Sequence, residues 1–225
     1  MGRVPRGRCH PDPGRRTGMM TDHRGRDVEA LRQRLRPNGG EHSVVAFQGE
    51  RGAYGHLAIE RLWGARAWDF PCRSFADVIA AVERGTAHYA VLPLHNELIG
   101  EIPGVRSAIE AAGLVVVGDV RQPVHHCLLG PPGSSLAAIT AVYSHPAALA
   151  QCARFLQRHA TVVPHEAYDT AGAARDVAAR GRRDEAAIAA EGCAERYSLQ
   201  LLARDVGDRV DNATTFAVVR RGGGP

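Results

Sequence analysis

Short apolar runs and blocks with apolar residues three and four apart take turns along this chain. The short runs end at glycine or polar residues and predict strands, at 43–49, 88–94, 114–120, 123–130, 138–146 (leading into a turn), 161–163, 185–190 and 213–221. The blocks between them predict helices, at 56–64, 74–85, 105–112, 147–159, 169–180 and 191–197. Strands and helices alternate throughout, so the predicted fold class is α/β with mostly parallel sheets.

The first 40 residues do not follow this pattern. They hold ten arginines against four acidic residues, with many glycines and prolines, and no aromatic residue lies among them. A basic segment of this composition predicts a disordered leader rather than a nucleic-acid site, so we expect no nucleic-acid partner. Because Met19 and Met20 could start translation, residues 1–18 are expected to be dispensable.

Composition narrows the class of protein further. A chain of 225 residues with 44% hydrophobic and 23% charged residues is typical of a globular protein with one domain or two small ones. No apolar run approaches the roughly 20 residues of a membrane span, and the basic start lacks the apolar core of a signal peptide. Five scattered cysteines form no C-x-x-C pair. We therefore expect a cytoplasmic protein with no membrane association, disulfide framework or metal site.

Polar residues gather where predicted strands end: Gln48, His95-Asn96-Glu97, Ser144-His145 and Asp169-Thr170. In open α/β sheets, ligands bind beyond the carboxyl ends of the strands. We therefore expect these residues to line a pocket. Its uncharged polar groups can bind substrate oxygens without a cofactor, and we place five of them there: Asn96, Ser144, Gln151, Thr170 and Thr214.

Three other motifs were weighed. The glycine-rich segment Gly49–Gly55 fits no nucleotide-binding motif, and it predicts instead a loop whose following helix turns its amide groups toward an anion such as a carboxylate. His125-His126-Cys127 could suggest metal ligands, but neighbouring strand residues point to opposite faces, which favours structural roles. Ser144-His145 lacks the G-x-S-x-G elbow of a nucleophile, so hydrogen bonding to substrate is expected there.

Several segments together resemble the prephenate dehydratase family. FQGERGAYGHLA resembles F-x-G-x-x-G-[AT]-[YF]-S-x-x-A, and SFADVIAAVERGTAHYAVLPLHNELIGEI resembles the family segment that contains P-I-E-N-S-x-x-G. YSHPAALAQC resembles Y-S-H-P-Q-A-L-x-Q-C, DTAGAA resembles S-T-A-x-A-A, and NATTFAVV resembles N-x-T-R-F-x-V-I. The matches run in order from about Val44 to Arg220. The resemblance implies two lobes similar to a periplasmic-binding-protein fold, with prephenate in the cleft, no cofactor and no regulatory ACT domain.

The chain also departs from the family pattern. The family's Glu-Asn-Ser reads His95-Asn96-Glu97, and the other replacements are Gly55 for Ser, Ala147 for Gln, Asp169 for Ser and Thr215 for Arg. The polar residues associated with binding are retained, together with Phe216. We interpret this as kept substrate binding with altered chemistry, similar to the family branch that decarboxylates prephenate without aromatising it. The alternatives are an ordinary prephenate dehydratase that gives phenylpyruvate and a non-catalytic module that binds small acids.

These interpretations assign roles to individual residues. His95 is expected to act as a new acid or orienting group, because an imidazole can donate a proton at neutral pH. Glu97 would share its face of the strand and act beside it, or else only position His95 or meet solvent. Another cation, either protonated His95, Arg51 or Arg106, is expected to replace the missing family arginine. Asn96 and Gln151 are expected to hold substrate oxygens.

The resemblance also implies an organisation for the whole chain. Lobe 1 is expected at 43–121 with 203–221 and lobe 2 at 122–202, in a homodimer. The expected catalytic residues are His95, Glu97 and Thr214. The expected substrate-binding residues are Gln48, Ala53, Tyr54, Asn96, Ser144, His145, Gln151, Asp169, Thr170, Thr215 and Phe216.

Overall fold

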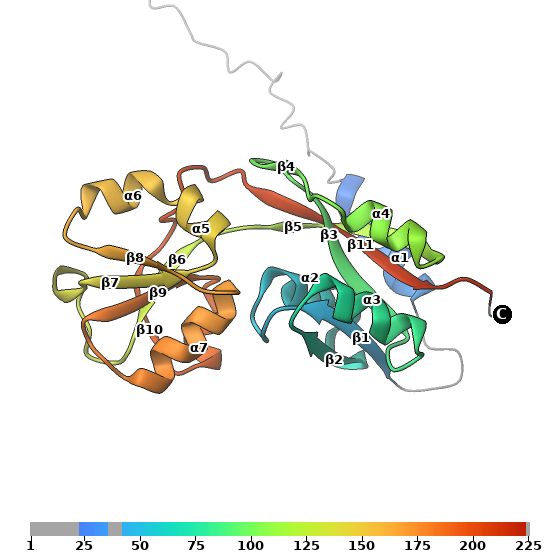
Figure 1. Ribbon diagram of the computed structural model, residues 1–225, viewed down its shortest axis with the longest axis horizontal. Helices are drawn as coiled ribbons and strands as arrows, with labels where there is room; N and C mark the ends of the chain where they lie inside the picture. Colours follow the sequence, from blue (N-terminus) through green and yellow to red (C-terminus); the bar gives the residue numbers. More distant parts are fainter. Residues whose placement is uncertain (1–22, 36–41, 224–225) are drawn as a thin grey trace, which may run out of the picture.

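The computed structural model describes residues 23–35 and 42–223, which form two sheets placed side by side (Figure 1). The first sheet has the strand order β2-β1-β3-β11-β5, with β4 paired to β3. Its strands are β1 (Ser43–Gln48), β2 (Ala67–Cys72), β3 (Tyr89–Asn96), β4 (Gly100–Glu101), β5 (Leu114–Pro123) and β11 (Ala213–Arg221). The second sheet has the order β10-β6-β9-β7-β8. Its strands are β6 (Cys127–Gly130), β7 (Ala141–Ser144), β8 (Val163–Glu166), β9 (Glu185–Ala189) and β10 (Gln200–Ala203).

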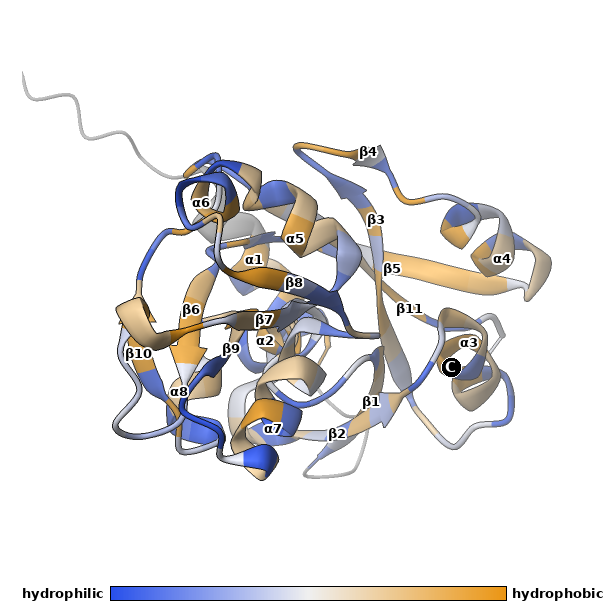
Figure 2. Ribbon diagram, turned by 60° about the vertical axis from the view of Figure 1, so that its left-hand side comes forward, coloured by the Kyte–Doolittle hydropathy of each residue, from blue (hydrophilic) through white to orange (hydrophobic). Residues whose placement is uncertain are grey.

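Helices cover both faces of each sheet. Those of the first lobe are α1 (His23–Arg34), α2 (Tyr54–Trp63), α3 (Phe75–Glu83) and α4 (Val105–Ala111). Those of the second are α5 (Pro146–Gln151), α6 (Ala153–Arg158), α7 (Thr170–Arg180) and α8 (Gly192–Arg196). Short 3-10 turns follow α2 at Gly64–Arg66 and precede β7 at Leu136–Ala138. Strands that are buried on both faces, such as β6 and β9, explain continuous apolar runs in the sequence. β5 is also largely hydrophobic (Figure 2), although Val115 and Val116 are exposed.

The predicted α/β class is confirmed, but the sheets are mixed rather than mostly parallel. Of the nine strand pairings within residues 42–223, four are parallel and five antiparallel. The parallel prediction assumed a helix between successive strands. β3 and β4 form a hairpin without a crossover helix, and β11, which the chain reaches after passing through the second lobe, lies antiparallel to both β3 and β5. Parallel pairing needs such a crossover, so these strands pair antiparallel to their neighbours.

The predicted disordered leader is wrong over its last part. Residues 23–34 form α1, and Leu31 and Leu35 are 5% and 2% exposed in the core with Ile59, Leu62 and Trp63 of α2. The side chain of Leu31 lies against Gly118 of β5, where an added Cβ would come within 2.5 Å of it. The prediction followed the arginine-rich composition and overlooked Leu31 and Leu35, which are four residues apart and therefore lie on one face of a helix. Residues 1–22, which include the expected internal start, lie outside the described residues.

No helix among the residues that the structure describes is both long and apolar enough to span a membrane.

Candidate active site

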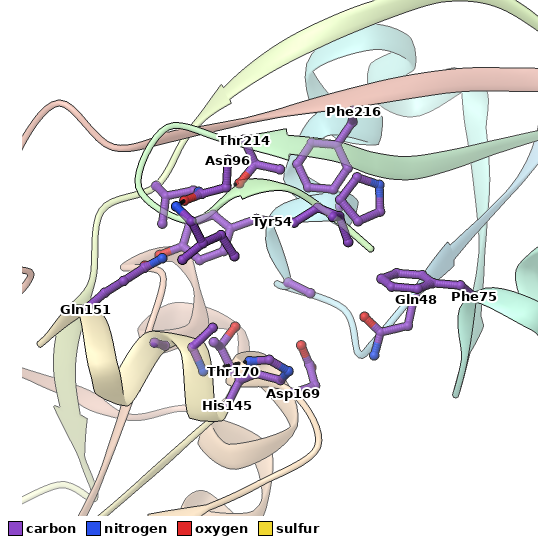
Figure 3. A pocket seen from close by; sticks show the side chains of 18 of the residues that line it. Gln48, Tyr54, Phe75, Asn96, His145, Gln151, Asp169, Thr170, Thr214 and Phe216 are labelled. Carbon is purple, nitrogen blue, oxygen red and sulfur yellow. Dashed lines mark hydrogen bonds between the residues drawn. The ribbon is translucent and has the colours of Figure 1, made fainter. Parts of the chain in front are cut away.

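A cavity of about 310 Å³ lies between the two lobes, at the ends of strands from both sheets. The first lobe contributes the end of β1, the start of α2, the end of β3 and the start of β11. The second lobe contributes the starts of α5 and α7. Figure 3 shows Asn96, Thr214 and Phe216 on one side of the cavity, with His145, Asp169 and Thr170 facing them from the other lobe.

Ten of the 14 predicted site residues line this cavity. They come from segments up to 168 positions apart, which the fold brings together at the cleft: Gln48, Ala53, Tyr54, Asn96, His145, Gln151, Asp169, Thr170, Thr214 and Phe216. The four that the structure places elsewhere are His95, Glu97, Ser144 and Thr215.

A bulge in β3 decides which residues of this strand face the cavity. Opposite β11, Phe216 pairs with Pro93 but Thr215 pairs with His95, so Leu94 is an extra residue. An extra residue shifts the alternation of side chains beyond it. Val91 and Pro93 therefore line the cavity before the bulge, and Asn96 lines it after the bulge. In a regular strand, His95 and Glu97 would have faced the cavity.

His95 and Glu97 instead are exposed and lie outside the cavity lining. His95 pairs in register with Thr215 and Glu101, and Glu97 forms an ion pair with Arg121 at 3.0 Å. β3 ends at Asn96 and Glu97 lies in the turn after it, so the expected sharing of one strand face by His95 and Glu97 does not arise. Their expected catalytic contact with a substrate in the cleft is therefore not what the geometry provides.

Thr215 and Ser144 also fall outside the cavity lining. Thr215 alternates with Thr214 and Phe216 along β11, so its side chain points to the opposite face. Ser144 is fully buried at the end of β7, and its hydroxyl donates to the carbonyl of Ile188 at 2.6 Å. This bond joins β7 to β9, which makes Ser144 a structural residue.

The side chain of Asn96 forms hydrogen bonds with several residues beside the cavity. Its amide Nδ2 donates to Asn212 Oδ1 at 2.9 Å, to the carbonyl of Ala213 at 3.1 Å and to Thr214 Oγ1 at 2.9 Å. Its Oδ1 accepts from the amides of Leu98 and Ile99, at 3.0 and 3.3 Å. The side chain is 4% exposed and its hydrogen-bonding capacity is used within the protein. Asn96 therefore positions its neighbours, a role different from the expected grip on substrate oxygens.

A second set of hydrogen bonds continues from Asn212 across the cleft. Asn212 Nδ2 and His126 Nε2 lie 3.0 and 2.8 Å from Gln151 Oε1, and the other nitrogen of His126 lies 3.1 Å from the Tyr54 hydroxyl. Because Gln151 Oε1 is an acceptor, we assign the imidazole proton to Nε2. Burial lowers the pKa of His126, which favours this neutral ring. The NH₂ of Gln151 is left to donate into the cavity.

Sequence reasoning missed His126 and Asn212. His126 had been considered only with its two neighbours as a metal ligand, and the alternation along the chain does separate exposed His125 from buried His126. Asn212 stands within the segment NATTFAVV, so its signal was present in the motif. The apolar part of the lining was missed as well, because apolar residues look alike in a sequence whether they line a cavity or a core: Phe75, Val91, Pro93, Ile99, Ile102, Pro103 and Val124.

Asp169 connects the two lobes beside the cavity. As the N-cap of α7, its Oδ2 accepts from the amide of Gly172 at 2.8 Å, and it also accepts from the amide of Glu50 in the first lobe at 3.0 Å. Gly49, with a φ of +105°, lies so close that an added Cβ would be 2.8 Å from Asp169 Oδ1. Only glycine suits both this backbone and this approach. Burial raises the pKa of Asp169 above its ordinary value.

The arginines expected to replace the missing family arginine do not line the cavity. Arg51 pairs with Asp69, and Arg106 pairs with Glu101 at 3.1 Å. Within the described part of the chain, the cavity lining contains no arginine, and no group of three or more His, Cys, Asp and Glu side chains is placed to hold a metal ion. The N-termini of two helices lie at the cavity: that of α2 has no side-chain cap and favours an anion, whereas that of α7 is capped by Asp169.

Comparison with known proteins places this site in a family. A family model described as prephenate dehydratase matches residues 45–223, which contain every element around the cavity. The chain belongs to the prephenate dehydratase family. Family membership agrees with the motif segments noted in the sequence.

Relatives of this family share the matched region. The chain is 40% identical over 179 residues to a bifunctional N-acyl-homoserine lactone acylase/prephenate dehydratase of Komagataeibacter europaeus, covering 79% of this chain and 63% of that protein. It is 41% identical over 186 residues to arogenate dehydratase 1 of Petunia hybrida, covering 82% of this chain and 44% of that protein. The chain thus spans less than two thirds of the length of these relatives.

A solved structure of a prephenate dehydratase supports the fold. The prephenate dehydratase of Arthrobacter aurescens, crystallised in complex with L-Phe, superposes with a TM-score of 0.71 at 28% identity. The match covers 80% of this chain and 61% of that one. The two-lobed α/β architecture of the prephenate dehydratase family is therefore confirmed for this chain.

Proposed function

We propose that this protein binds prephenate, or its α-amino counterpart arogenate, in the cleft and removes carbon dioxide and water from it. The C–C bond to the ring carboxylate breaks, its electrons enter the ring, and the 4-hydroxyl leaves as water after accepting a proton. The product is phenylpyruvate from prephenate or phenylalanine from arogenate. Aromatisation drives the reaction, so the enzyme has to supply only orientation and a proton donor.

The observation that carries this proposal is the orientation of Thr214. Its Oγ1 accepts a hydrogen bond from Asn96 at 2.9 Å, while the residue lines the cavity. A hydroxyl whose lone pair is engaged by a donor directs its own hydrogen elsewhere, and here the open direction is the cavity. Thr214 is thus suited to donate to the departing 4-hydroxyl, as a group positioned by Asn96.

The cavity also suits the shape and charge of the substrate. Phe75, Phe216 and Ile102 offer an apolar surface to the ring, and the NH₂ of Gln151 offers a donor to an oxygen. Amide groups at the start of α2, which has no side-chain cap, lie at the cleft and favour a carboxylate. Of the replaced positions, His95, Glu97 and Thr215 lie off the cavity, which weakens the argument for altered chemistry that rested on them, whereas Gly55, Ala147 and Asp169 line it.

Non-aromatising decarboxylation of prephenate, the reaction expected from the sequence, is the second candidate. It begins with cleavage of the same C–C bond and differs in the destination of the proton, which goes to a ring carbon while the 4-hydroxyl stays. The observation in its favour is that His145 lies in the cavity lining; its Nδ1 accepts from the amide of Ala147, which leaves the proton of the neutral ring on Nε2 to be delivered.

Product analysis by proton NMR separates these reactions. After incubation with prephenate and, separately, with arogenate, aromatic protons are expected. Retained ring vinyl protons beside an intact 4-hydroxyl would instead identify the decarboxylase, and unchanged substrate would leave only a binding role. Thr214→Val is expected to lose most activity and Thr214→Ser to keep a substantial part. Equal activity in both variants would remove Thr214 as the proton donor.

A further inference from the structure

Asp169 is the one carboxylate in the cavity lining among the described residues, and it is almost fully buried. It is 6% exposed, and both hydrogen bonds that it accepts, from Glu50 N and Gly172 N, end on Oδ2. Oδ1 makes no hydrogen bond with the described part of the chain, and on one side it lies against Gly49. Figure 3 shows the side chain of Asp169 pointing into the cavity.

No cationic side chain balances this charge. None of the ion pairs among residues 23–35 and 42–223 includes Asp169. Glu50 lies nearby, and its own carboxylate is paired with Arg175 at 2.5 Å. The amides of Glu50 and Gly172 and the N-terminus of α7 stabilise Oδ2, but a buried carboxylate without a cation remains unfavourable beside a substrate that carries two carboxylates of its own.

We propose that Asp169 binds the α-ammonium group of the substrate and thereby makes this site select arogenate over prephenate. The inference rests on the proposed function and adds the substrate preference and the residue that sets it. The two substrates differ only in the side chain, which carries an α-ammonium carbon in arogenate and a ketone in prephenate. An ammonium group at Oδ1 would complete the ion pair that the protein itself lacks.

The surroundings of Asp169 suit the rest of an amino-acid group. The carboxylate of an α-amino acid lies two bonds from its ammonium nitrogen and needs donors close by. Ala53, at the start of α2, lies beside Gly49 and therefore beside Asp169, since an added Cβ on Gly49 would meet both side chains. The first amides of α2 and the hydroxyl of Thr170, the residue after Asp169, offer those donors.

Two variants test the role of the charge. Asn and Ser both cap helices well, so Asp169→Asn and Asp169→Ser keep a cap for α7 while removing the negative charge. Asp184→Asn is the matched control, because Asp184 is an exposed residue of the same lobe, paired with Arg182, and lies outside the cavity. Thermal unfolding of all variants checks that the fold is kept.

Steady-state kinetics with both substrates give the first readout. The wild type is expected to have a higher kcat/KM for arogenate than for prephenate, and Asp169→Asn is expected to lower this ratio roughly 10- to 100-fold, the value of a charged hydrogen bond. Asp184→Asn should leave the ratio unchanged. A wild-type preference for prephenate, with the ratio unaltered or reversed in Asp169→Asn, would mean that a protonated Asp169 donates to the ketone, and would overturn the inference.

A binding experiment separates this inference from the proposed function. The two products, L-phenylalanine and phenylpyruvate, differ as the substrates do, because one carries an α-ammonium group and the other a ketone. Their binding can be measured without turnover. Calorimetry is expected to show tighter binding of L-phenylalanine to the wild type and loss of this preference in Asp169→Asn. If neither substrate reacts but the preference holds, the proposed function fails and the ammonium site stands. If phenylpyruvate binds as well as L-phenylalanine, the ammonium site is wrong.

Discussion

The role of Asn96 can be tested by a change of one atom. Asn96→Asp keeps the oxygen that accepts from the amides of Leu98 and Ile99, but replaces the NH₂ that donates to Asn212, Ala213 and Thr214. At pH 8.5, well above the pKa of roughly 3.9 of an ordinary aspartate, the new group is expected to be an acceptor. The hydroxyl of Thr214 would then turn its hydrogen toward this carboxylate and away from the cavity.

The expected changes in stability and in kcat follow from these contacts. The carbonyl of Ala213 still accepts from the amide of Glu97 at 2.9 Å, so it stays satisfied. Asn212 Oδ1 loses its partner at a site that is 3% exposed, which costs about 1–3 kcal/mol of unfolding free energy, and the new buried carboxylate adds a desolvation cost. The loss of a positioned proton donor is expected to lower kcat by about 10²- to 10⁴-fold. Because kcat is compared on folded protein, its decrease should exceed what the loss of stability explains.

The assay follows the aromatic product by absorbance, with urea unfolding measured on the same preparations. Gln157→Glu, an equivalent change on the exposed side of α6, is the control and should match the wild type in both measurements. If Asn96→Asp shows a cooperative urea transition, and is therefore folded, but keeps kcat within about twofold of the wild type, Thr214 does not deliver the proton. The orientation argument would then be refuted.

Three further predictions follow from the structure. His95→Ala should keep kcat within about twofold, because His95 is exposed on the face of β3 away from the cavity; a heavy loss of turnover would restore it to the chemistry. Leu31→Ala should lower the unfolding free energy by about 2–5 kcal/mol, whereas Gln33→Ala on the exposed side of α1 should not, and equal urea midpoints would contradict the packing of α1. Burial lowers the pKa of His126 and of His56, so below pH about 6.5 the unfolded chain binds more protons than the folded one. Unfolding free energies measured from pH 7.5 to 5 should therefore fall as the pH drops, and values that rise over this range would contradict the prediction.

Local sequence patterns predicted many of the residues that line the cavity. Gln48, Asn96 and Thr170 were expected in a pocket because each stands where a strand ends or a helix begins, and this follows from the spacing of apolar residues alone. Their neighbours could not be assigned with the same rule. Apolar lining residues such as Phe75 and Ile102 look like any core residue, and the hydrogen bonds that join His126 to Gln151 connect positions 25 apart in the sequence.

The sequence by itself determined most of the elements, the α/β class, the family and the set of polar residues at the strand ends, because the patterns that reveal them lie within short segments of the chain; β2, β4, β10 and α1 were not predicted. Only the tertiary structure decided which of those residues meet. The bulge at Leu94 arises from the register between β3 and β11, about 120 positions apart in the sequence, and it turns Asn96 toward the cavity and His95 away from it. The burial of α1 likewise depends on a surface formed by α2 and β5. Side-chain alternation is a local property, but the face to which it points is set by a partner strand that the local sequence does not contain.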